Sequence, residues 1–263
     1  MRTLLLRLIG PMQSWGIDSR FVMRETGLEP SKSGVIGLLC AALGKPKRDE
    51  EAEHPDYPPL SRLAGLRLGV RVDRPGVMHV DYHTAGGAHL PEETTEGSWQ
   101  LYGVLEAGSK PRKFDEPPRK GDLKTELSYR FYLADAAFLV GLQAMDAEDK
   151  YWLGKIQERL KKPRWQIYLG RKSFVPSEPV WFRDDELEQW SAMPLEEAIS
   201  SAPRLVKDEV PLRLVFDADP DDPAQLAEAI ARKDVPTSFE HRRFTTRYVV
   251  NKFISLPERR NGL

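Results

Sequence analysis

The stretch TLLLRLIGPMQSWG at residues 3–16, followed by PSKSGVIGLLCAALG at residues 30–44, predicts the order of elements at the amino end of the chain. The first stretch opens with apolar residues on both faces of an extended chain, broken only by Arg7, which is typical of a central strand. In the second stretch, Ser31 is a favourable N-cap for an apolar helix, and Gly44 is of the type that commonly ends one. The sequence therefore predicts a strand, a polar loop and a helix.

The start of this helix carries donors that suit a phosphate group. The N–H groups at a helix N-terminus favour an anion, and Lys32 and Ser33 add a positive charge and a hydroxyl. Thr26 and Ser31 stand where a phosphate-binding P-loop has its two glycines, and Pro30 removes an N–H, so nucleotide hydrolysis is disfavoured. We expect a phosphate contact here, and the alternative is an ordinary capped helix with a solvated Lys32.

The middle of the chain continues the alternation of strands and helices. Residues 66–72 and 77–83 alternate between apolar and polar, and residues 129–133 and 136–142 predict two further strands. Asp146 is placed to cap a second helix. The order of strand, helix, strand, arm, strand and helix is most of a ferredoxin-like βαββαβ unit.

We therefore expect an α+β fold with three parts. A ferredoxin-like body occupies residues 1–170, and a β-hairpin arm, or thumb, is inserted in it at residues 77–133. A small β-rich C-terminal part, residues 171–263, packs on the body, with strands expected at residues 211–216 and 243–254. The tip of the arm is long and rich in Gly, Pro and charge, which is typical of a functional segment.

Composition limits the class of protein. The chain is 40% hydrophobic, which is enough for a core and argues against global disorder. Its single cysteine, Cys40, lies in the apolar helix, so a disulfide framework is excluded and a reducing compartment is expected. The apolar start of the chain is too short to span a membrane. We expect a cytoplasmic protein without membrane contact.

The charges are segregated, although the formal net charge is only −1. Between residues 155 and 172 a single acid, Glu158, accompanies Lys155, Arg159, Lys161, Lys162, Arg164, Arg171 and Lys172. Four more basic residues and no acid lie between residues 242 and 252. Such clusters suit a polyanion such as RNA, and the alternative for each is a solvated face.

Aromatic rings beside these basic residues suit unstacked bases. Trp15, Tyr168 and Phe244 each adjoin basic or amide side chains, the combination that binds bases and phosphates together. The motif YLGRKS at residues 168–173 is the most specific, because Gly170 lets the backbone approach a ligand while Arg, Lys and Ser donate hydrogen bonds. A buried core role is the alternative for each ring.

His79, Asp81 and His83 alternate along one predicted strand and therefore share a face. A lone strand rarely supplies three metal ligands at suitable angles, and no Cys or carboxylate cluster completes a site. A plain polar face is favoured, with an RNA contact as the second interpretation. We expect no metal, no cofactor and no catalytic residue.

Several motifs, taken in order, resemble the CasD family, the fifth-family CRISPR-associated subunit of type I-E Cascade. The main matches are LRLIGPMQSWG at residues 6–16 and PSKSGVIGLL at residues 30–39. Supporting matches are DYHT at 81–84, YLADA at 132–136, KPR at 162–164, YLGRKS at 168–173 and HRRF at 241–244. Together the matches extend over nearly the whole chain.

The resemblance implies a repeat-associated mysterious protein (RAMP), with an RRM-like ferredoxin body and a protruding thumb where the arm at 77–133 is expected. It implies a non-catalytic subunit of an antiviral surveillance complex that caps the 5′ handle of CRISPR RNA. The implied protein partners are the backbone subunit and the large PAM-reading subunit, and target DNA is met only through the complex. Residues 89–119, at the arm tip, match none of the family motifs.

We expect RNA contacts from the first loop, the helix start, the arm and the basic clusters. The candidate RNA-binding residues are Gln13, Ser14, Trp15, Arg20, Arg24, Lys32, Ser33, His83, Arg164, Tyr168, Arg171, Lys172, Arg242 and Arg243.

Two alternatives remain open. The first is a metal-independent endoribonuclease that processes repeat RNA, with His83 or His241 and a nearby Tyr or Lys as acid and base. The second is a protein-only scaffold, whose arm and acidic loops bind partner proteins while RNA binding is incidental.

Overall fold

The structure is a computed structural model that describes residues 2–17, 19–20, 22–48, 54–86, 99–100, 113–114, 125–207 and 211–254. The chain divides into two compact units. The first unit comprises Met1–Ile17, Glu25–His79 and Tyr132–Leu263, and the second comprises Asp18–Arg24 and Val80–Phe131.

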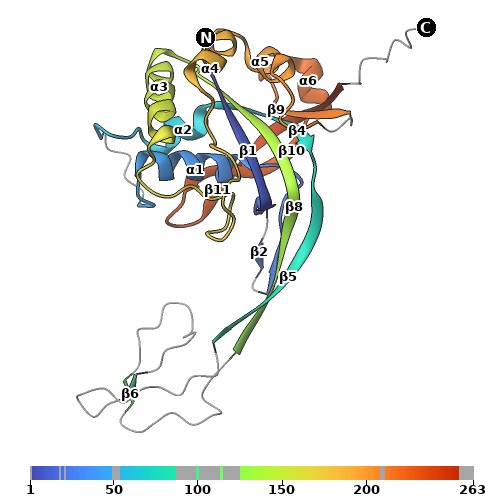
Figure 1. Ribbon diagram of the computed structural model, residues 1–263. Coiled ribbons are helices and arrows are strands. Elements are labelled where there is room, and N and C mark those ends of the chain that lie inside the picture. Colours follow the sequence, from blue (N-terminus) through green and yellow to red (C-terminus); the bar gives the residue numbers. More distant parts are fainter. Residues whose placement is uncertain are drawn as a thin grey trace. The chain divides into compact units, whose positions relative to one another are not determined.

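The first unit is built on a curved antiparallel sheet (Figure 1). Its strand order is β10-β11-β9-β4-β8, with β1 on the far side of β8. The strands are β1 (Thr3–Gln13), β4 (Arg67–Arg74), β8 (Thr125–Gln143), β9 (Leu212–Asp217), β10 (Ile230–Ser238) and β11 (Arg243–Ile254). On β8, Val140 lies opposite Leu6 of β1 and Val70 of β4, so β8 is the central strand of this part.

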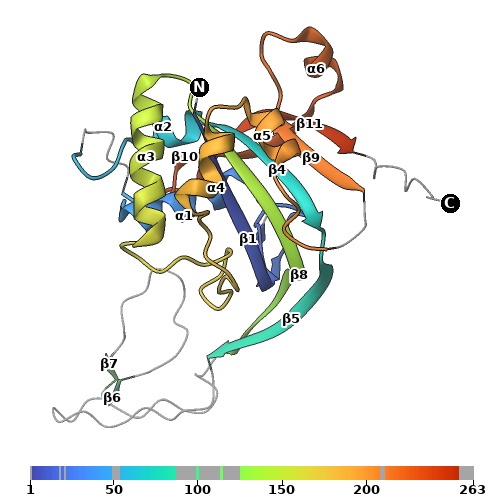
Figure 2. The ribbon, with the colours of Figure 1, turned by 45° about the horizontal axis from the view of Figure 1, so that its top comes forward.

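The described residues contain six helices beside the sheet: α1 (Lys32–Leu43), α2 (Leu60–Gly65), α3 (Ala147–Lys161), α4 (Asp184–Ser191), α5 (Leu195–Ser201) and α6 (Pro223–Glu228). Figure 2 shows α1 and α3 near each other, and α5 close to β4. Helix α5 can approach the sheet because a Cβ on Gly69 would lie 2.5 Å from Ile199, and one on Gly141 would lie 2.6 Å from Leu195. None of the described helices is both long and apolar enough to cross a membrane.

The first strand and first helix agree with the sequence prediction. Leu4, Leu5, Leu6 and Leu8 are all buried, as expected of a strand covered on both faces. The Ser31 side chain accepts a hydrogen bond from the α1 backbone, and Gly44 ends the helix in the left-handed conformation.

Strand β1 is covered on its outer edge without a full strand. The backbone N–H of Arg7 donates to Val180, that of Ser177 donates to Ile9, and Leu6 forms an isolated bridge with Trp181. At this edge of β1 the described segment 177–181 contributes an isolated bridge and backbone hydrogen bonds in place of a full strand. Strand β9 pairs directly with β4, so residues 212–254 extend the same sheet.

The two strands predicted around residues 134–135 form one continuous strand, β8, which corrects the sequence prediction. Asp135 adopts a positive φ of 54° inside this strand, and its side chain pairs with Arg74 at 2.8 Å. The strand therefore continues through the irregular residue, with its register to β1 unchanged on either side.

The second unit contains β2 (Ser19–Arg20), β3 (Met23–Arg24), the distal part of β5 (Val77–Gly86) and the first part of β8. Strand β3 runs parallel to β8, with Arg24 opposite Arg130. A short pair, β6 (Trp99–Gln100) and β7 (Lys113–Phe114), belongs to the predicted arm tip, and the rest of the tip lies outside the described residues.

Candidate nucleic-acid interface

The first loop, with Gln13 and Trp15, is folded inward. Gln13 is fully buried, and its amide nitrogen donates to the carbonyls of Leu8 at 3.0 Å and Ala136 at 2.7 Å. Its amide oxygen accepts from the Trp15 indole N–H at 3.2 Å. The Trp15 ring is 1% exposed and lies so close to α1 that a Cβ on Gly34 would be 2.8 Å from it. In this structure both side chains hold the loop in place and present no surface to a base.

The donors at the start of α1 have internal partners. The backbone N–H of Lys32 donates to Asp234 Oδ2 at 2.8 Å, and the Lys32 ammonium donates to Asp217 Oδ2 at 2.9 Å. The Ser31 hydroxyl accepts from the backbone of Gly34, and the half-buried Ser33 lies beside it. The Asp234 carboxylate thus occupies the position at the helix start where a phosphate was expected. We therefore do not include Lys32 and Ser33 in the proposed RNA surface.

Arg247 completes a closed network of charges. Its guanidinium makes two hydrogen bonds to Asp234, at 2.7 and 2.8 Å, and a third to Asp217. Burial alone would raise the pKa of Asp217, but Lys32 and Arg247 outweigh it and hold that pKa below the usual range. Two buried acids and two buried bases therefore tie α1 to β9, β10 and β11.

A third carboxylate, that of Glu29, fixes the loop before α1. Glu29 is buried and pairs with Arg213 at 2.7 Å and with Arg232. Burial would raise the pKa of Glu29, but the Arg213 hydrogen bond and the charges of Arg232 and Arg213 lower it overall. The front of α1 is thus bound to the C-terminal strands by buried or half-buried ion pairs.

The segment 162–173, here called the basic loop, lies against the first loop. Gly170 has a φ of 99°, and a Cβ on it would be 1.9 Å from the carbonyl oxygen of Ser14. The backbone N–H of Ser14 donates to Leu169 at 3.0 Å. Two segments singled out from the sequence, the first loop and YLGRKS, are therefore in contact through backbone that only a glycine permits.

The other end of the basic loop is fixed on the C-terminus of α1. The backbone N–H groups of Arg164 and Trp165 donate to the carbonyls of Ala42 and Ala41, at 3.0 and 3.1 Å. The stem of Arg164 lies over Gly44, where an added Cβ would meet it at 2.2 Å. Both ends of the loop are thus held by hydrogen bonds to backbone.

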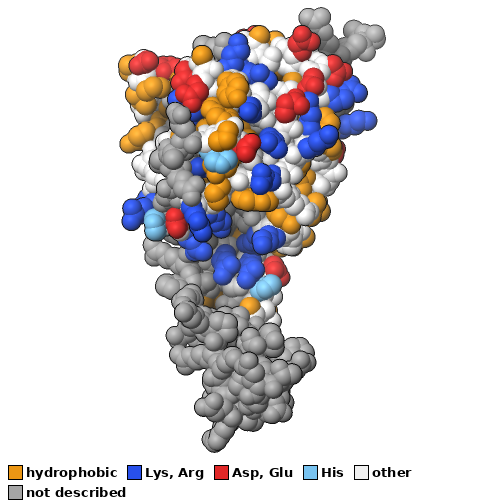
Figure 3. Space-filling model, turned by 90° about the vertical axis from the view of Figure 1, so that its left-hand side faces the viewer, with side chains coloured by type: hydrophobic (Ala, Val, Ile, Leu, Met, Phe, Trp, Pro, Cys, Tyr) orange, Lys and Arg blue, Asp and Glu red, His pale blue; other side chains and the backbone are white. Residues whose placement is uncertain are grey.

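Most of the basic side chains of the basic loop reach solvent, whereas Ile167 and Leu169 within it are buried. Lys162, Arg164 and Lys172 are exposed, and Arg171 is half-buried with its guanidinium 5.4 Å from the Phe174 ring centre. The Tyr168 hydroxyl donates to the Gln166 amide oxygen at 3.1 Å. Figure 3 shows one face of the molecule, on which Lys and Arg side chains are spread among apolar ones while acidic side chains gather mostly toward its upper end.

Sequence reasoning missed Trp165, which is 47% exposed within the basic loop. The available signal was its position in KPRWQ, where basic or amide residues precede and follow it.

The remaining candidates lie elsewhere. Arg242, with a positive φ of 51°, and Arg243 are exposed at the turn from β10 into β11. Arg24 and His83 belong to the second unit, and the side chain of Arg20 lies outside the described residues. His83 Nδ1 is 3.8 Å from Asp81 Oδ2. Within the described ranges no three His, Cys, Asp or Glu side chains are grouped so as to hold a metal ion.

Arg24 and Arg130 form a pair of like charges on neighbouring strands of the second unit. Burial and the charge of Arg24 lower the pKa of Arg130, while Asp81 partly offsets them. Arg130 Nε donates to the Ser128 hydroxyl at 3.0 Å.

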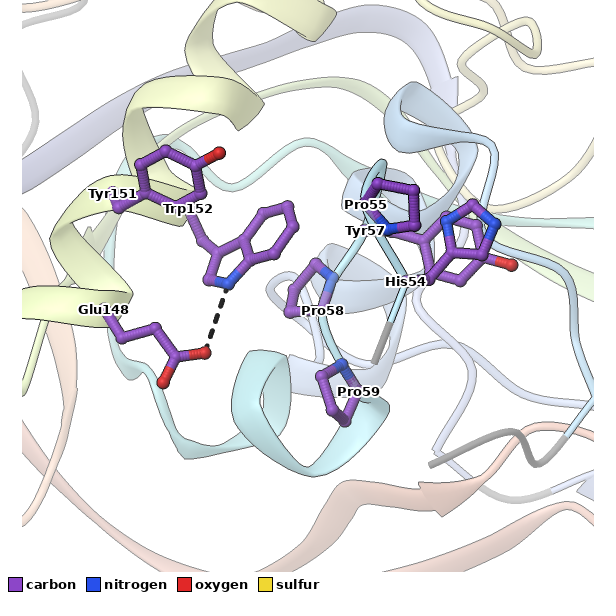
Figure 4. A pocket seen from close by; sticks show the side chains of 8 residues that line it. All are labelled: His54, Pro55, Tyr57, Pro58, Pro59, Glu148, Tyr151 and Trp152. Carbon is purple, nitrogen blue, oxygen red and sulfur yellow. Dashed lines mark hydrogen bonds between the residues drawn. The ribbon is translucent and has the colours of Figure 1, made fainter. Parts of the chain in front are cut away.

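A separate hollow of about 410 Å³ lies between α3 and the segment before α2 (Figure 4). It is lined by His54, Pro55, Tyr57, Pro58, Pro59, Glu148, Tyr151 and Trp152. Glu148 accepts from the Trp152 indole N–H at 3.4 Å and pairs with Arg62 at 2.7 Å, and His54 stacks on Tyr57. Among its described lining residues the one carboxylate, Glu148, is already paired with Arg62, and no Lys or Arg lines it, so we do not assign the hollow to a polyanion.

Comparisons with known proteins agree with the motifs. A family model described as CRISPR-associated protein (Cas_Cas5) matches residues 3–250. The chain is 30% identical over 187 residues to the CRISPR system Cascade subunit CasD of Escherichia coli K12, covering 68% of this chain and 69% of that protein.

Two solved structures are similar over almost the full length. A chain in a crystal structure of a Cas protein has 35% identity and a TM-score of 0.64, covering 96% of this chain and 95% of its own. A chain from a CRISPR RNA-guided surveillance complex has 33% identity and a TM-score of 0.65, covering 97% of this chain and 91% of its own. The chain therefore belongs to the Cas5 family of CRISPR-associated proteins.

Proposed function

We propose that this chain is the Cas5, or CasD, subunit of a type I-E Cascade surveillance complex and caps the 5′ handle of CRISPR RNA. The observation that carries the proposal is the similarity, over 97% of the chain, to a chain of an RNA-guided surveillance complex. The likeness to the E. coli Cascade subunit supports the same assignment.

The basic loop is the surface of the first unit that suits RNA best. No Asp or Glu occurs from Arg159 to Ser177, whereas Lys162, Arg164, Arg171 and Lys172 all lie in this span. Because both ends of the loop are held by backbone hydrogen bonds, the backbone that carries its donors is ordered before a ligand arrives. Phosphates of a bound strand would pair with these side chains.

The second unit offers a further anion contact. Arg24 and Arg130 repel each other, and a phosphate group bound between them would relieve that repulsion. The same unit exposes Val80, Tyr82 and Tyr129, which suit contact with a neighbouring protein subunit. We assign contacts with RNA and with the backbone subunit to the second unit, which contains most of the arm. A contact with the large PAM-reading subunit, and through that subunit with target DNA, is proposed from the family assignment alone.

We also infer that β1, α1, β4, β8 and α3 form a ferredoxin-like core. Its strands follow the order β1-β8-β4, and the segment that forms the Leu6–Trp181 bridge takes the place of the fourth strand.

The proposed role is binding without catalysis. The alternative endoribonuclease would rely on His83, which belongs to the second unit, or His241, which belongs to the first. Purified protein would be incubated with repeat RNA in EDTA, with His83→Ala and His241→Ala as matched variants. We expect intact RNA in all three samples, and handle-specific cleavage that either variant abolishes would contradict this proposal.

Crosslinking of handle RNA in the assembled complex tests the binding proposal directly. Ultraviolet irradiation followed by peptide mapping should give adducts in residues 162–173 and in the second unit. Adducts found wholly outside these segments would contradict the proposed RNA surface. An isolated subunit that binds handle and scrambled RNA equally at low salt would favour the protein-only scaffold.

A further inference from the structure

Trp165 is a large aromatic side chain left open to solvent in the middle of the basic loop. Nearly half of its surface is exposed. In the part of the chain that the structure describes, no other ring stacks on it and no Lys or Arg is placed over its face. About half of the Trp165 surface is therefore left for contact with a ligand.

The backbone at Trp165 is fixed. Its N–H donates to Ala41 at 3.1 Å, and the N–H of the preceding Arg164 donates to Ala42 at 3.0 Å. Because two successive residues are bonded to the end of α1, the backbone that carries the ring is held in place. Little backbone ordering has to accompany the binding of a ligand.

The basic residues that flank Trp165 in the sequence favour a strand of nucleic acid over a neutral ligand. Lys162 and Arg164 are exposed on one side of Trp165 in the sequence, and Arg171 and Lys172 follow on the other. An aromatic ring between cations matches a single strand, in which bases alternate with phosphates.

We propose that Trp165 is the platform on which one unpaired RNA base stacks, and that it gives the basic loop a preference for single-stranded over duplex RNA. A base inside a duplex has both faces covered by its neighbours, so only a splayed base can lie on the ring. Stacking tolerates any base, because every base has a flat aromatic face. This inference rests on the proposed RNA-binding function and adds the residue that selects an unpaired base.

Tyr151 provides a matched control. It is 55% exposed and has Lys155 5.3 Å from its ring centre, so it is an exposed ring with a cation beside it. It lies on α3 beside Glu148, at the hollow that we do not assign to RNA. A general loss of exposed aromatic surface would affect Tyr151→Ala and Trp165→Ala alike, whereas the proposal predicts an effect for Trp165 alone.

The test measures binding of the full chain to labelled handle RNA at several salt concentrations. Trp165→Ala should weaken binding by about five- to 150-fold, the usual range for one stacked base. It should leave unchanged the salt slope, which is the slope of the logarithm of the binding constant against the logarithm of the salt concentration. Trp165→Phe should restore most of the affinity, and Tyr151→Ala should bind as the wild type does. For duplex RNA, Trp165→Ala and the wild type should bind equally.

An abasic linker introduced at each handle position in turn identifies the stacked base. At one position the linker should weaken wild-type binding as much as Trp165→Ala does, and should not weaken the variant further. The proposal would be overturned if the loss of affinity from the linker added to that from Trp165→Ala at every handle position. It would also be overturned if Trp165→Ala weakened the binding of single-stranded and duplex RNA equally.

Two further outcomes are distinguishable. If Trp165→Ala binds RNA normally but fails to enter the assembled complex, the ring contacts a protein subunit and the proposal is wrong. In the second outcome the wild type shows no preference for handle over scrambled RNA, yet Trp165→Ala binds single-stranded RNA more weakly than the wild type. This result would contradict handle capping and support base stacking on Trp165.

Discussion

Asp234 Oδ2 lies 2.8 Å from the backbone nitrogen of Lys32, so a carboxylate from β10 occupies the anion position at the start of α1. Free N–H groups at a helix N-terminus attract an anion of any origin. In this protein the anion is supplied by the chain itself, and the Lys32 ammonium is neutralised by Asp217. The helix start therefore locks the C-terminal strands onto the body.

Lys32→Met tests this role. Removing one member of a buried charge network leaves Asp217 without one of its partners, and we expect the free energy of unfolding to fall by about 3–5 kcal/mol. Urea unfolding measures the change, with Lys150→Met, on the exposed face of α3, as the control. Unchanged stability together with a smaller salt slope of RNA binding would instead place Lys32 on a phosphate.

Glu29→Gln tests the pH dependence of the second ion pair. The folded-state pKa of Glu29 is lowered, so its contribution to stability is present above the ordinary glutamate pKa of about 4.3 and is lost as pH falls through the folded value. The variant should be less stable than the wild type at pH 7, and the difference should shrink below about pH 4.

Urea unfolding at pH 7, 5 and 3 measures this difference, with the exposed Glu228→Gln as the control. A gap between wild type and Glu29→Gln that widens toward low pH would contradict the assignment.

Gly170→Ala tests the contact between the basic loop and the first loop. The added Cβ would lie 1.9 Å from the Ser14 carbonyl oxygen, at a φ of 99° that an alanine rarely adopts. We expect a loss of about 1–3 kcal/mol in stability and weaker RNA binding, because the loop must move away from Ser14. Gly16→Ala is the control, since nothing lies within 4 Å of a Cβ there. Equal effects of the two substitutions would count against the contact.

Lys172→Ala tests the electrostatic part of RNA binding. Loss of one phosphate contact should weaken binding to all RNA sequences and reduce the salt slope by about 0.7, the value for one charge on a single strand. The exposed Lys150→Ala, which removes the same charge outside the basic loop, should leave the slope unchanged. Equal slopes for Lys172→Ala and the wild type would remove Lys172 from the RNA surface.

The sequence determined those features that depend on near neighbours in the chain. Ser31 caps α1, Gly44 ends it, and Asp146 caps α3, as predicted, because each of these signals acts within one helical turn. The strand expected at residues 243–254 is β11, because its apolar pattern is local as well. The motifs also identified the family, because they occur in the family's order along the chain, and the family model matches residues 3–250.

Which groups those elements present to solvent depends on long-range packing, which the sequence pattern does not reveal. The partners of Lys32, Asp217 and Asp234, are 185 and 202 residues away in the sequence. No pattern of neighbouring residues predicts contacts over such separations. The same N-terminal N–H groups bind a carboxylate as readily as a phosphate, so the choice depends on whether the sheet brings Asp234 there. Trp15 and Trp165 both stand beside polar or basic residues in the sequence, yet their exposure differs. The Trp15 ring is buried against α1 at Gly34. Trp165 lies in a loop whose backbone is bonded to the end of α1, and nearly half of its surface remains exposed.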